Sequence, residues 1–194
     1  MKILNKRHIP KFCVIVGACF LLIGAVVLVS WQWKIHSSEA KAATYVETLQ
    51  NLIPEPRGAI PEERRDNTMS VYPVDGIDFV GILEMPRYES VLPVCATWGQ
   101  VTNYPCRYDG SVYDRTLQIG ATTQKGQYDF YREISVGDVV HFTDMEGNRY
   151  TYTVTSLHYE QHADQTALDR EASDLTLFVK NIYAFEYLII SCRA

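Results

Sequence analysis

The sequence predicts a mainly β fold: a small closed β-barrel of seven to eight strands with one or two short helices, preceded by a transmembrane helix. Three observations predict it. From Val71 onward the chain consists of short runs rich in Val, Ile, Thr, Tyr and Phe, separated by turn signals such as Asp-Gly and Gly-Asp. Among these runs, only residues 163–173 have the composition of a helix. Before this region, residues 12–31 contain no charged side chain.

Length and composition place the chain among globular proteins. It has 194 residues, of which 47% are apolar and 21% are charged, and such fractions are typical of a folded chain rather than a disordered one. This length accommodates one domain of about 100 to 150 residues with additional segments. The formal net charge is −5, and an acidic chain gives no indication of nucleic-acid binding. We therefore expect a single globular domain with no nucleic-acid partner.

Residues 12–31 are predicted to form a single transmembrane anchor. As a helix, twenty uncharged residues cover a hydrocarbon core of about 30 Å. Four basic residues precede this stretch: Lys2, Lys6, Arg7 and Lys11. Two tryptophans, Trp31 and Trp33, lie where the apolar stretch gives way to polar sequence. This arrangement predicts a cytoplasmic basic segment at 1–11, a single pass through the cell membrane and an extracytoplasmic remainder.

A cleaved signal peptide is the alternative interpretation of the same stretch. The Ala-Lys-Ala sequence at 40–42 resembles a cleavage site. However, the apolar stretch is longer than the roughly 7 to 15 residues of a signal peptide, and residues 40–42 lie well beyond its end. We therefore expect the anchor to remain uncleaved.

Residues 32–69 are predicted to form an extracytoplasmic helix and linker. The helix would begin at Ser37 or Ser38 as the N-cap residue. Apolar residues recur in it at helical spacing: Tyr45, Leu49 and Leu52. One turn of this helix could pack on the domain that follows. Prolines and charged residues then dominate and indicate a linker before the globular domain at 70–194.

The globular domain is expected to consist of short strands. The clearest hairpin is at 144–154, where Gly147 and Asn148 supply the turn and the second strand alternates Tyr and Val with Thr. The segments with the composition of strands are 78–85, 90–97, 116–122, 138–145, 149–159, 175–181 and 186–192. So many short strands in about 120 residues favour a closed barrel.

The order of these segments resembles that of a sortase domain of class B type. The matching stretches are, in chain order, DGIDFVGILEMP, LPV, PCRYDGS, a strand ending in Gly120, SVGDVVHFTDMEGNRYTYTV, DLTLF and LIISC. Sortases are membrane-anchored, extracytoplasmic cysteine transpeptidases of Gram-positive bacteria. The resemblance covers residues 71–192. It implies a sortase-like barrel behind the predicted anchor, a link to surface-protein anchoring at the cell wall, and no cofactor.

The resemblance also implies a definite chemistry. A sortase cuts a sorting signal of the LPxTG type by thiolate attack, forms a thioester and passes the acyl group to an amine. This reaction needs an accessible cysteine, a histidine that moves protons and an arginine near the developing oxyanion. In the family, these residues come from a GHN segment, a TLxTC segment and the last strand.

At all three positions this sequence has a different residue. The GHN segment reads Gly120, Ala121, Thr122, so Ala121 replaces the histidine. The TLxTC segment reads TLFVK, so Lys180 replaces the cysteine. Tyr187 lies near the place of the last-strand arginine. The resemblance therefore implies a sortase-like domain that has lost its catalytic groups.

Each replacement removes a different capability. Ala121 cannot carry a proton. Lys180 is an ammonium near neutral pH, and its acylation would give an amide, which is much harder to turn over than a thioester. Tyr187 donates a hydrogen bond but carries no fixed charge. Without the resemblance, a lysine at the solvent-facing end of a strand would need no functional explanation.

Cysteines elsewhere in the domain are the candidates for a disulfide or a substitute nucleophile. An odd number of exported cysteines predicts at most one disulfide and one free thiol. Cys95 with Cys106 and Cys106 with Cys192 both remain open as pairs. A substitute nucleophile at Cys95 or Cys192, with His158 as base, is a further alternative. Neither cysteine lies in a motif that places it near a base, so buried or disulfide-bonded cysteines are expected.

Histidines and acidic residues cluster at 158–164. Two histidines four residues apart can bind zinc on a helix, but here the pattern is that of a strand running into a loop, so no metal site is expected. In sortases, the loop that continues through 163–173 helps to shape the sorting-signal groove. The resulting candidates for ligand contacts are Thr122, Thr176, His158 and His162.

Two functions from different classes follow. In the first, the chain is a membrane-tethered pseudosortase that binds a sorting-signal peptide, a cell-wall component, or a partner such as a pilin or an active sortase. In the second, it is a transpeptidase or peptidase acting on LPxTG-like signals with a non-standard nucleophile. A domain that serves as a spacer and binds nothing is the third alternative.

Overall fold

The computed structural model describes residues 9–54, 68–169, 173–182 and 184–194. The chain forms two compact units, Met1–Ser37 and Ser38–Ala194. The second unit contains the predicted globular domain.

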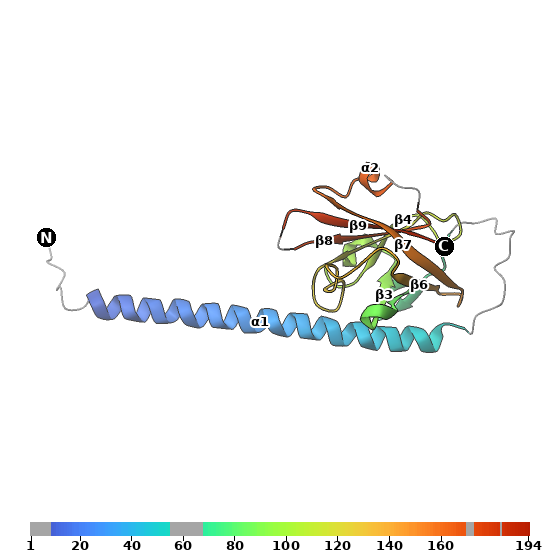
Figure 1. Cartoon of the computed structure of the whole chain (residues 1–194). Helices are drawn as coiled ribbons and strands as arrows, with labels where there is room; N and C mark the ends of the chain where they lie inside the picture. The colour runs from blue at the N-terminus through green and yellow to red at the C-terminus, as the bar shows by residue number, and fades with distance from the viewer. Residues whose placement is uncertain (1–8, 55–67, 170–172, 183) are drawn as a thin grey trace. The chain divides into compact units, whose positions relative to one another are not determined.

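The long helix α1 spans Ile9–Leu52 (Figure 1). Within the first unit, consecutive large apolar side chains of this helix are exposed, from Phe20 to Ile23 and from Val26 to Val29. In the part of the chain that the structure describes, no helix combines the length and the apolarity that a membrane crossing requires.

The predicted start of a separate helix at Ser37 or Ser38 is wrong. α1 runs without interruption through both residues and ends at Leu52, shortly before Pro54. No proline or glycine lies between Ser30 and Pro54, so nothing in this stretch stops the helix or requires a new N-cap.

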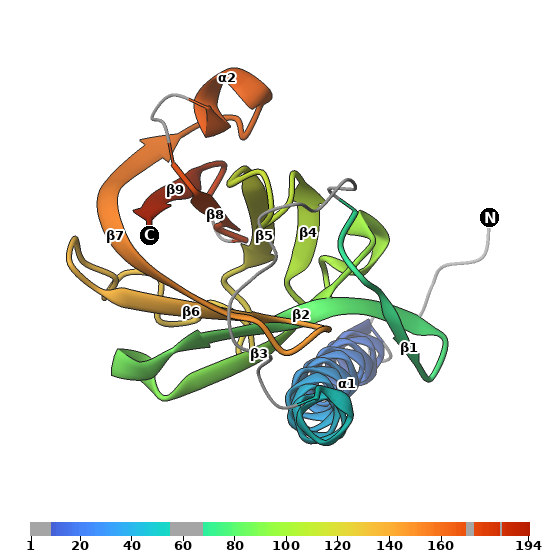
Figure 2. The same ribbon diagram turned by 90° about the vertical axis from the view of Figure 1, so that its right-hand side faces the viewer.

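Strands of the second unit close into a barrel. Within the described residues there are nine strands, and the hydrogen-bonded order β2-β3-β4-β5-β8-β9-β7-β6 returns to β2 through a β2–β6 pairing (Figure 2). β1 pairs only with β2 and lies outside this ring of eight. The bounds are β1 Tyr72–Val74, β2 Ile77–Met85, β3 Ser90–Cys95, β4 Cys106–Asp109, β5 Leu117–Thr122, β6 Val139–Asp144, β7 Arg149–Glu160, β8 Leu175–Lys180 and β9 Tyr187–Arg193.

The predicted closed barrel is confirmed, and so is the hairpin of β6 and β7. Every segment with strand composition forms a strand, whereas β1 and β4 were not predicted because they are only three and four residues long. Three short helices are present where one or two were predicted: η1 Pro86–Tyr88, η2 Trp98–Gln100 and α2 Gln165–Leu168. The predicted helix at 163–173 is confirmed only as α2, and residues 170–172 lie outside the described residues.

Side chains of each barrel strand alternate between the interior and the outer face. Along β8, Leu175, Leu177 and Val179 belong to the interior core. The alternate residues Thr176, Phe178 and Lys180 therefore face outward, and Phe178 belongs to a separate outer cluster with Leu168 and Ile189. This alternation decides which predicted site residues can reach a ligand.

The last turns of α1 pack within the second unit. Ala42, Tyr45 and Leu49 are buried in a cluster with residues of β2 and β3. The Tyr45 ring lies 5.3 Å from that of Phe79 and 5.6 Å from that of Tyr104, measured between centroids. The prediction that this helix packs on the domain is confirmed for Tyr45 and Leu49, whereas Leu52 is 42% exposed.

Candidate functional site

Three neighbouring strands bring the candidate residues to one edge of the barrel. β5 and β8 are parallel, so their C-terminal ends lie together, and β9 begins at the same edge because it is antiparallel to β8. Thr122, Lys180 and Tyr187 are consequently in register across the three strands. Residues 65 positions apart in the chain thus become neighbours. The sequence predicted Ala121 at this place, whereas the residue of β5 that is level with Lys180 is Thr122.

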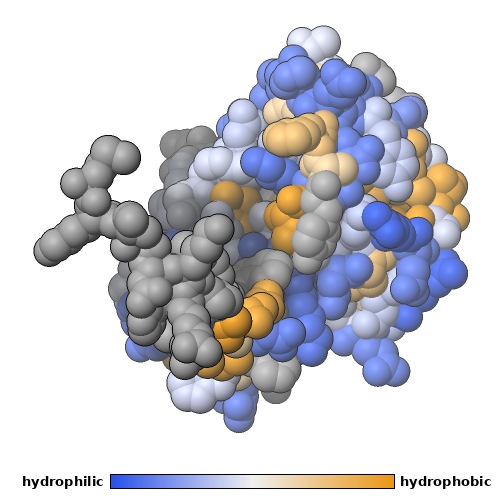
Figure 3. All heavy atoms as spheres, turned by 90° about the vertical axis from the view of Figure 1, so that its left-hand side faces the viewer, coloured by the Kyte–Doolittle hydropathy of each residue, from blue (hydrophilic) through white to orange (hydrophobic). Residues whose placement is uncertain are grey.

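A pocket of ≈ 740 Å³ opens at this edge. Its walls are Tyr108 of β4, residues 161–164 of the loop after β7, Lys180, and residues 185–187 at the start of β9. We call it the β8 pocket. Figure 3 shows the face that carries the β8–β9 turn, where hydrophobic and hydrophilic surface lie side by side. Its volume lies within the range of roughly 300 to 1,000 Å³ that ligand pockets span.

Lys180 is the exposed end of a buried strand. Its neighbour Val179 lies in the interior core, and the Lys180 carbonyl accepts a hydrogen bond of 3.1 Å from the Thr123 backbone N–H. The backbone of Lys180 is therefore fixed by β5 and β9 while its side chain faces the β8 pocket. No ion pair found among the described residues involves Lys180.

Both carboxylates that line the β8 pocket are held by local structure. Asp164 caps α2, and its Oδ1 accepts a hydrogen bond of 2.9 Å from the Ala167 backbone N–H. Oε1 of Glu186 accepts a hydrogen bond of 3.1 Å from the Asn181 side-chain amide. These contacts orient the two carboxylates and use part of their capacity to accept hydrogen bonds.

Ala121 lies at the same edge but on the other face of the barrel wall. Its side chain is 1% exposed and belongs to the interior core. Thr122 is the residue of β5 that is level with Lys180. Thr122 is itself buried, and its backbone N–H donates to the Gln127 side-chain oxygen at 2.9 Å. Ala121 therefore does not line the β8 pocket.

Of the other candidate site residues, some line the β8 pocket and some do not. His162 and Tyr187 line the β8 pocket. His158 lies on β7 opposite Ile189 and is not one of the lining residues. Thr176 is buried on β8, and its hydroxyl is 2.6 Å from that of Ser173. The structure thus brings Lys180, Tyr187 and His162 together and leaves Ala121, Thr176 and His158 outside.

An aromatic cluster covers the outer face of β5 and β8 beside the pocket. The ring of Trp98 stacks on that of Phe178 with centroids 5.5 Å apart, and Tyr108 contacts both rings at 5.1 and 5.4 Å. Gly120 lies beneath them: a Cβ there would be 2.5 Å from Phe178 and from Trp98. No sequence pattern predicted this cluster, because Trp98 begins the three-residue helix η2 after β3, which is too short to show a periodic pattern.

Comparison with known structures identifies this architecture. Sortase A from Corynebacterium diphtheriae is similar to the chain at 12% identity with a TM-score of 0.51, covering 82% of this chain and 83% of that one. A pilus-related sortase C of Group B Streptococcus has 17% identity and a TM-score of 0.50, with coverages of 84% and 89%. The fold is that of a sortase. Sortase C1 from Streptococcus agalactiae is similar at 15% identity and a TM-score of 0.51, over 62% and 69% of the two chains.

The resemblance predicted from the sequence is confirmed at the level of the fold. No protein-family profile and no curated protein sequence matches the chain. Identities of this size establish a shared fold alone, so what the sortase-like domain does must be argued from its own residues.

Cysteines of the sortase-like domain are buried and lie away from the β8 pocket. Cys95, Cys106 and Cys192 are each 0% exposed and free. A hydrogen bond with the Cys106 thiol, together with burial, raises the pKa of Cys95 far above its ordinary value. Burial raises the pKa of Cys192 to about 12. A nucleophilic cysteine needs an accessible thiolate, and burial denies access to all three of these thiols.

The described residues offer no candidate metal-binding site. Within those residues, no group of three or more His, Cys, Asp or Glu side chains is placed to hold one ion. His158 ends up within β7, whereas His162 follows the end of that strand. The two histidines therefore do not share a helical face.

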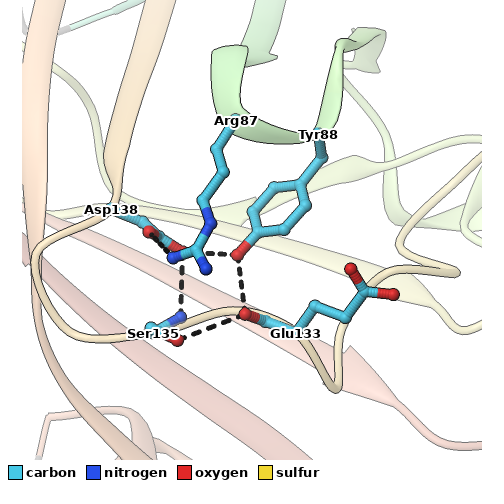
Figure 4. Close-up of polar contacts among 5 residues, drawn as sticks. All are labelled: Arg87, Tyr88, Glu133, Ser135 and Asp138. Atoms are coloured by element: carbon cyan, nitrogen blue, oxygen red, sulfur yellow. Dashed lines mark hydrogen bonds and ion pairs between the residues drawn. The ribbon is translucent and has the colours of Figure 1, made fainter.

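A second polar cluster, shown in Figure 4, fastens the η1 turn to the loop before β6. Arg87 forms an ion pair of 2.6 Å with Asp138, and the Tyr88 hydroxyl donates to Asp138 and to the Glu133 carbonyl. The Ser135 backbone N–H donates to Asp138 at 2.9 Å. Burial opposes the charge on Asp138, but these hydrogen bonds outweigh it and lower its pKa. Because the Asp138 carboxylate accepts from Arg87, Tyr88 and the Ser135 backbone, the cluster acts as a structural clamp.

Proposed function

We propose that the chain is a membrane-anchored, extracytoplasmic member of the sortase family that binds a peptide or cell-wall ligand in the β8 pocket without cutting it. One observation carries the proposal. The position that corresponds to the sortase nucleophile holds Lys180, and it faces a ligand-sized pocket. The fold is that of a sortase, and Ala121, Lys180 and Tyr187 stand where the resemblance implies the chemical groups that a sortase uses.

The chemistry of the pocket supports binding without turnover. Neither a cysteine nor a serine lines it, and its histidine, His162, lies in the loop after β7 rather than on β5. Tyr187 replaces a fixed positive charge with a neutral hydroxyl. A thioester step needs a thiolate, a proton carrier and stabilisation of an oxyanion together, and loss of groups that act as a unit removes nearly all of the rate.

The proposed anchor places this domain outside the cell membrane. Its support is the uncharged stretch at 12–31, the basic residues before it and the tryptophans after it. A domain tethered in this way meets cell-wall components, surface-protein precursors and neighbouring sortases without needing high affinity, because both partners share the membrane surface.

Retained activity through Lys180 is the competing function. A deprotonated lysine could attack a carbonyl and remain attached through an amide. The specific observation in its favour is that the Lys180 side chain faces the pocket. Such a reaction would leave a permanent adduct on Lys180 and would consume one ligand per protein.

The test uses the full-length chain in detergent micelles with a panel of LPxTG-type peptides and an amine acceptor. Mass spectrometry of the peptides and of the intact protein is expected to find neither cleavage nor an adduct. Fluorescence anisotropy of the same labelled peptides is expected to show saturable binding. Cleavage that a thiol reagent abolishes would overturn the proposal.

Two further outcomes separate the competing functions. An adduct that disappears in a Lys180→Ala variant would establish lysine-dependent acylation. A complete failure to bind any peptide or cell-wall fragment would favour a spacer. A Lys125→Ala variant is the matched control for loss of one exposed lysine, since Lys125 pairs with Glu39 and does not line the β8 pocket.

A further inference from the structure

We propose that the β8 pocket recognises a peptide carboxylate, with the Lys180 ammonium as its anion anchor and the aromatic side chains around it as the contact for a neighbouring apolar residue. This inference rests on the proposed binding function and names the chemistry of the ligand.

The first step concerns charge within the β8 pocket. Among the described residues that line it, Lys180 is the only Lys or Arg, and Asp164 and Glu186 are the acidic ones. Asp164 is oriented by the N-terminus of α2, and Glu186 by the side chain of Asn181. Because neither carboxylate is ion-paired with Lys180 among the described residues, the ammonium remains available for a ligand.

The second step concerns the rigidity of the site. Lys180 is the last residue of β8 and is paired on both sides, with Thr122 and with Tyr187. Its backbone therefore needs no rearrangement when a ligand binds, and only the side chain must settle on the anion. His162 lies in the same lining, and its ring N–H can add a hydrogen bond to the same carboxylate.

The third step concerns the apolar part of the pocket. Phe185 is 101% exposed, and Tyr108 is 43% exposed. An entirely exposed phenylalanine gains free energy when a ligand side chain covers it, by roughly 25 cal/mol for each Å² of apolar surface removed from water. These rings and Tyr187 line the same pocket as Lys180, so a ligand that combines a carboxylate with an apolar side chain satisfies both kinds of surface.

The same features favour a peptide over an anionic polymer such as a polyphosphate. A phosphate chain needs several cations along its length, whereas the β8 pocket offers one lysine between two carboxylates. Its exposed aromatic rings would have no partner on such a polymer. A short peptide with one carboxylate next to an apolar residue matches the number of charges and the aromatic surface.

The experiment compares three hexapeptides that carry a neutral fluorophore, titrated into the full-length chain in detergent micelles. The first is Leu-Pro-Glu-Thr-Gly-Phe with a free C-terminus. The second is the same sequence with an amidated C-terminus, and the third has Gln for Glu and the amide. A charge-assisted hydrogen bond predicts that the most acidic peptide binds about tenfold more tightly than the uncharged one.

Variants assign this preference to Lys180. Lys180→Met keeps the length of the side chain and is expected to abolish the preference, so that the three peptides bind with equal affinity. Phe185→Ala is expected to weaken all three peptides and to keep the preference. Lys125→Met, which removes an exposed lysine outside the pocket, is expected to change neither quantity. Thermal unfolding of each variant verifies that the fold is intact.

The outcomes distinguish the inference from the function on which it rests. If the peptides bind with equal affinity, or if Lys180→Met retains the preference for the acidic one, the carboxylate anchor is wrong and the binding function stands. If none of the peptides binds at millimolar concentration, the peptide-binding function itself is overturned. Tight binding of inorganic polyphosphate, lost in Lys180→Met, would replace the peptide by a phosphate ligand.

Discussion

Cys95 on β3 and Cys106 on β4 lie directly opposite each other and are the single residue pair in register between these parallel strands. Both are fully buried and belong to the same cluster of buried side chains. The junction of β3 with β4 is therefore the shortest strand pairing of the barrel ring, and two cysteines occupy it. Cys192 lies in the interior core, apart from this pair.

This relationship selects one of the two disulfides that the sequence left open. In an oxidising compartment, we predict that Cys95 and Cys106 lose two protons and two electrons to a thiol oxidant and form a disulfide, which would stabilise the fold by about 2 to 3 kcal/mol. Maleimide labelling of the oxidised, denatured chain should then leave both unlabelled and modify Cys192. Labelling of all three before reduction would contradict the prediction, and Cys106→Ser provides the control.

At Tyr128, the effect of a buried hydroxyl group on the free energy of unfolding can be tested. Its side chain is completely buried, its hydroxyl has no hydrogen-bond partner in the structure as described, and burial raises its pKa well above the ordinary value. Tyr128→Phe removes this group and should increase the free energy of unfolding by about 1 kcal/mol. Tyr88→Phe, which loses hydrogen bonds to Asp138 and the Glu133 carbonyl, should decrease it by a similar amount.

Chemical denaturation of both variants measures the difference directly. A Tyr128→Phe variant that is less stable than the parent would show that the hydroxyl has a favourable contact, for example with a buried water molecule.

Gly120 should tolerate no side chain. A Cβ at this position would lie 2.5 Å from the rings of Phe178 and Trp98, so Gly120→Ala must displace the indole or cost about 1 to 3 kcal/mol of stability. Gly99→Ala is the matched control, because a Cβ there meets nothing within 4 Å. In a Trp31→Phe, Trp33→Phe background, the emission of Trp98 should change for the first variant and not for the second. Equal behaviour of the two would contradict the close packing.

The clamp at Asp138 should make stability depend on acid pH. The pKa of Asp138 in the folded protein is lowered from 3.8. This carboxylate therefore binds a proton less readily in the folded state than in the unfolded state. The stability that the carboxylate contributes is complete above pH 4 and is lost as the pH falls through the lowered pKa. Asp138→Asn should flatten this acid limb when unfolding is followed from pH 6 to pH 2. An unchanged slope would exclude Asp138 as its source.

Restoring two family residues should not restore a transpeptidase. In an Ala121→His, Lys180→Cys variant, the new histidine would start from a position whose side chain faces the interior core, and Tyr187 would still stand where the resemblance implies an arginine. We expect turnover of an LPxTG-type peptide to stay at background. Thr122→His with Lys180→Cys is the comparison, because Thr122 is level with Lys180. Efficient turnover by the first variant would show that the position assigned to the arginine is wrong.

The sequence could predict the barrel because its strands are amphipathic or wholly apolar and are bounded by turn residues. It could also place Lys180 and Tyr187 near each other, since both lie next to one turn between paired strands. The sequence could not predict on which face of the barrel wall the Ala121 side chain lies. A shift of one residue along a strand exchanges the two faces, and both faces of β5 are buried. The cluster of Trp98 on Phe178 arises from tertiary packing between a turn and a strand, which no local pattern encodes.

The indole of Trp98 covers the outer surface of β5 at Gly120, and a mutation can remove it. A Trp98→Gly variant would open a flat, aromatic-walled hole over Gly120 and Phe178, next to the β8 pocket. Free indole could then refill that hole, and a ligand bearing an added aromatic group could reach it only in the variant. The domain thus carries a natural position for a bump-and-hole pair, by which a ligand could be directed to this chain and not to other proteins of the same fold.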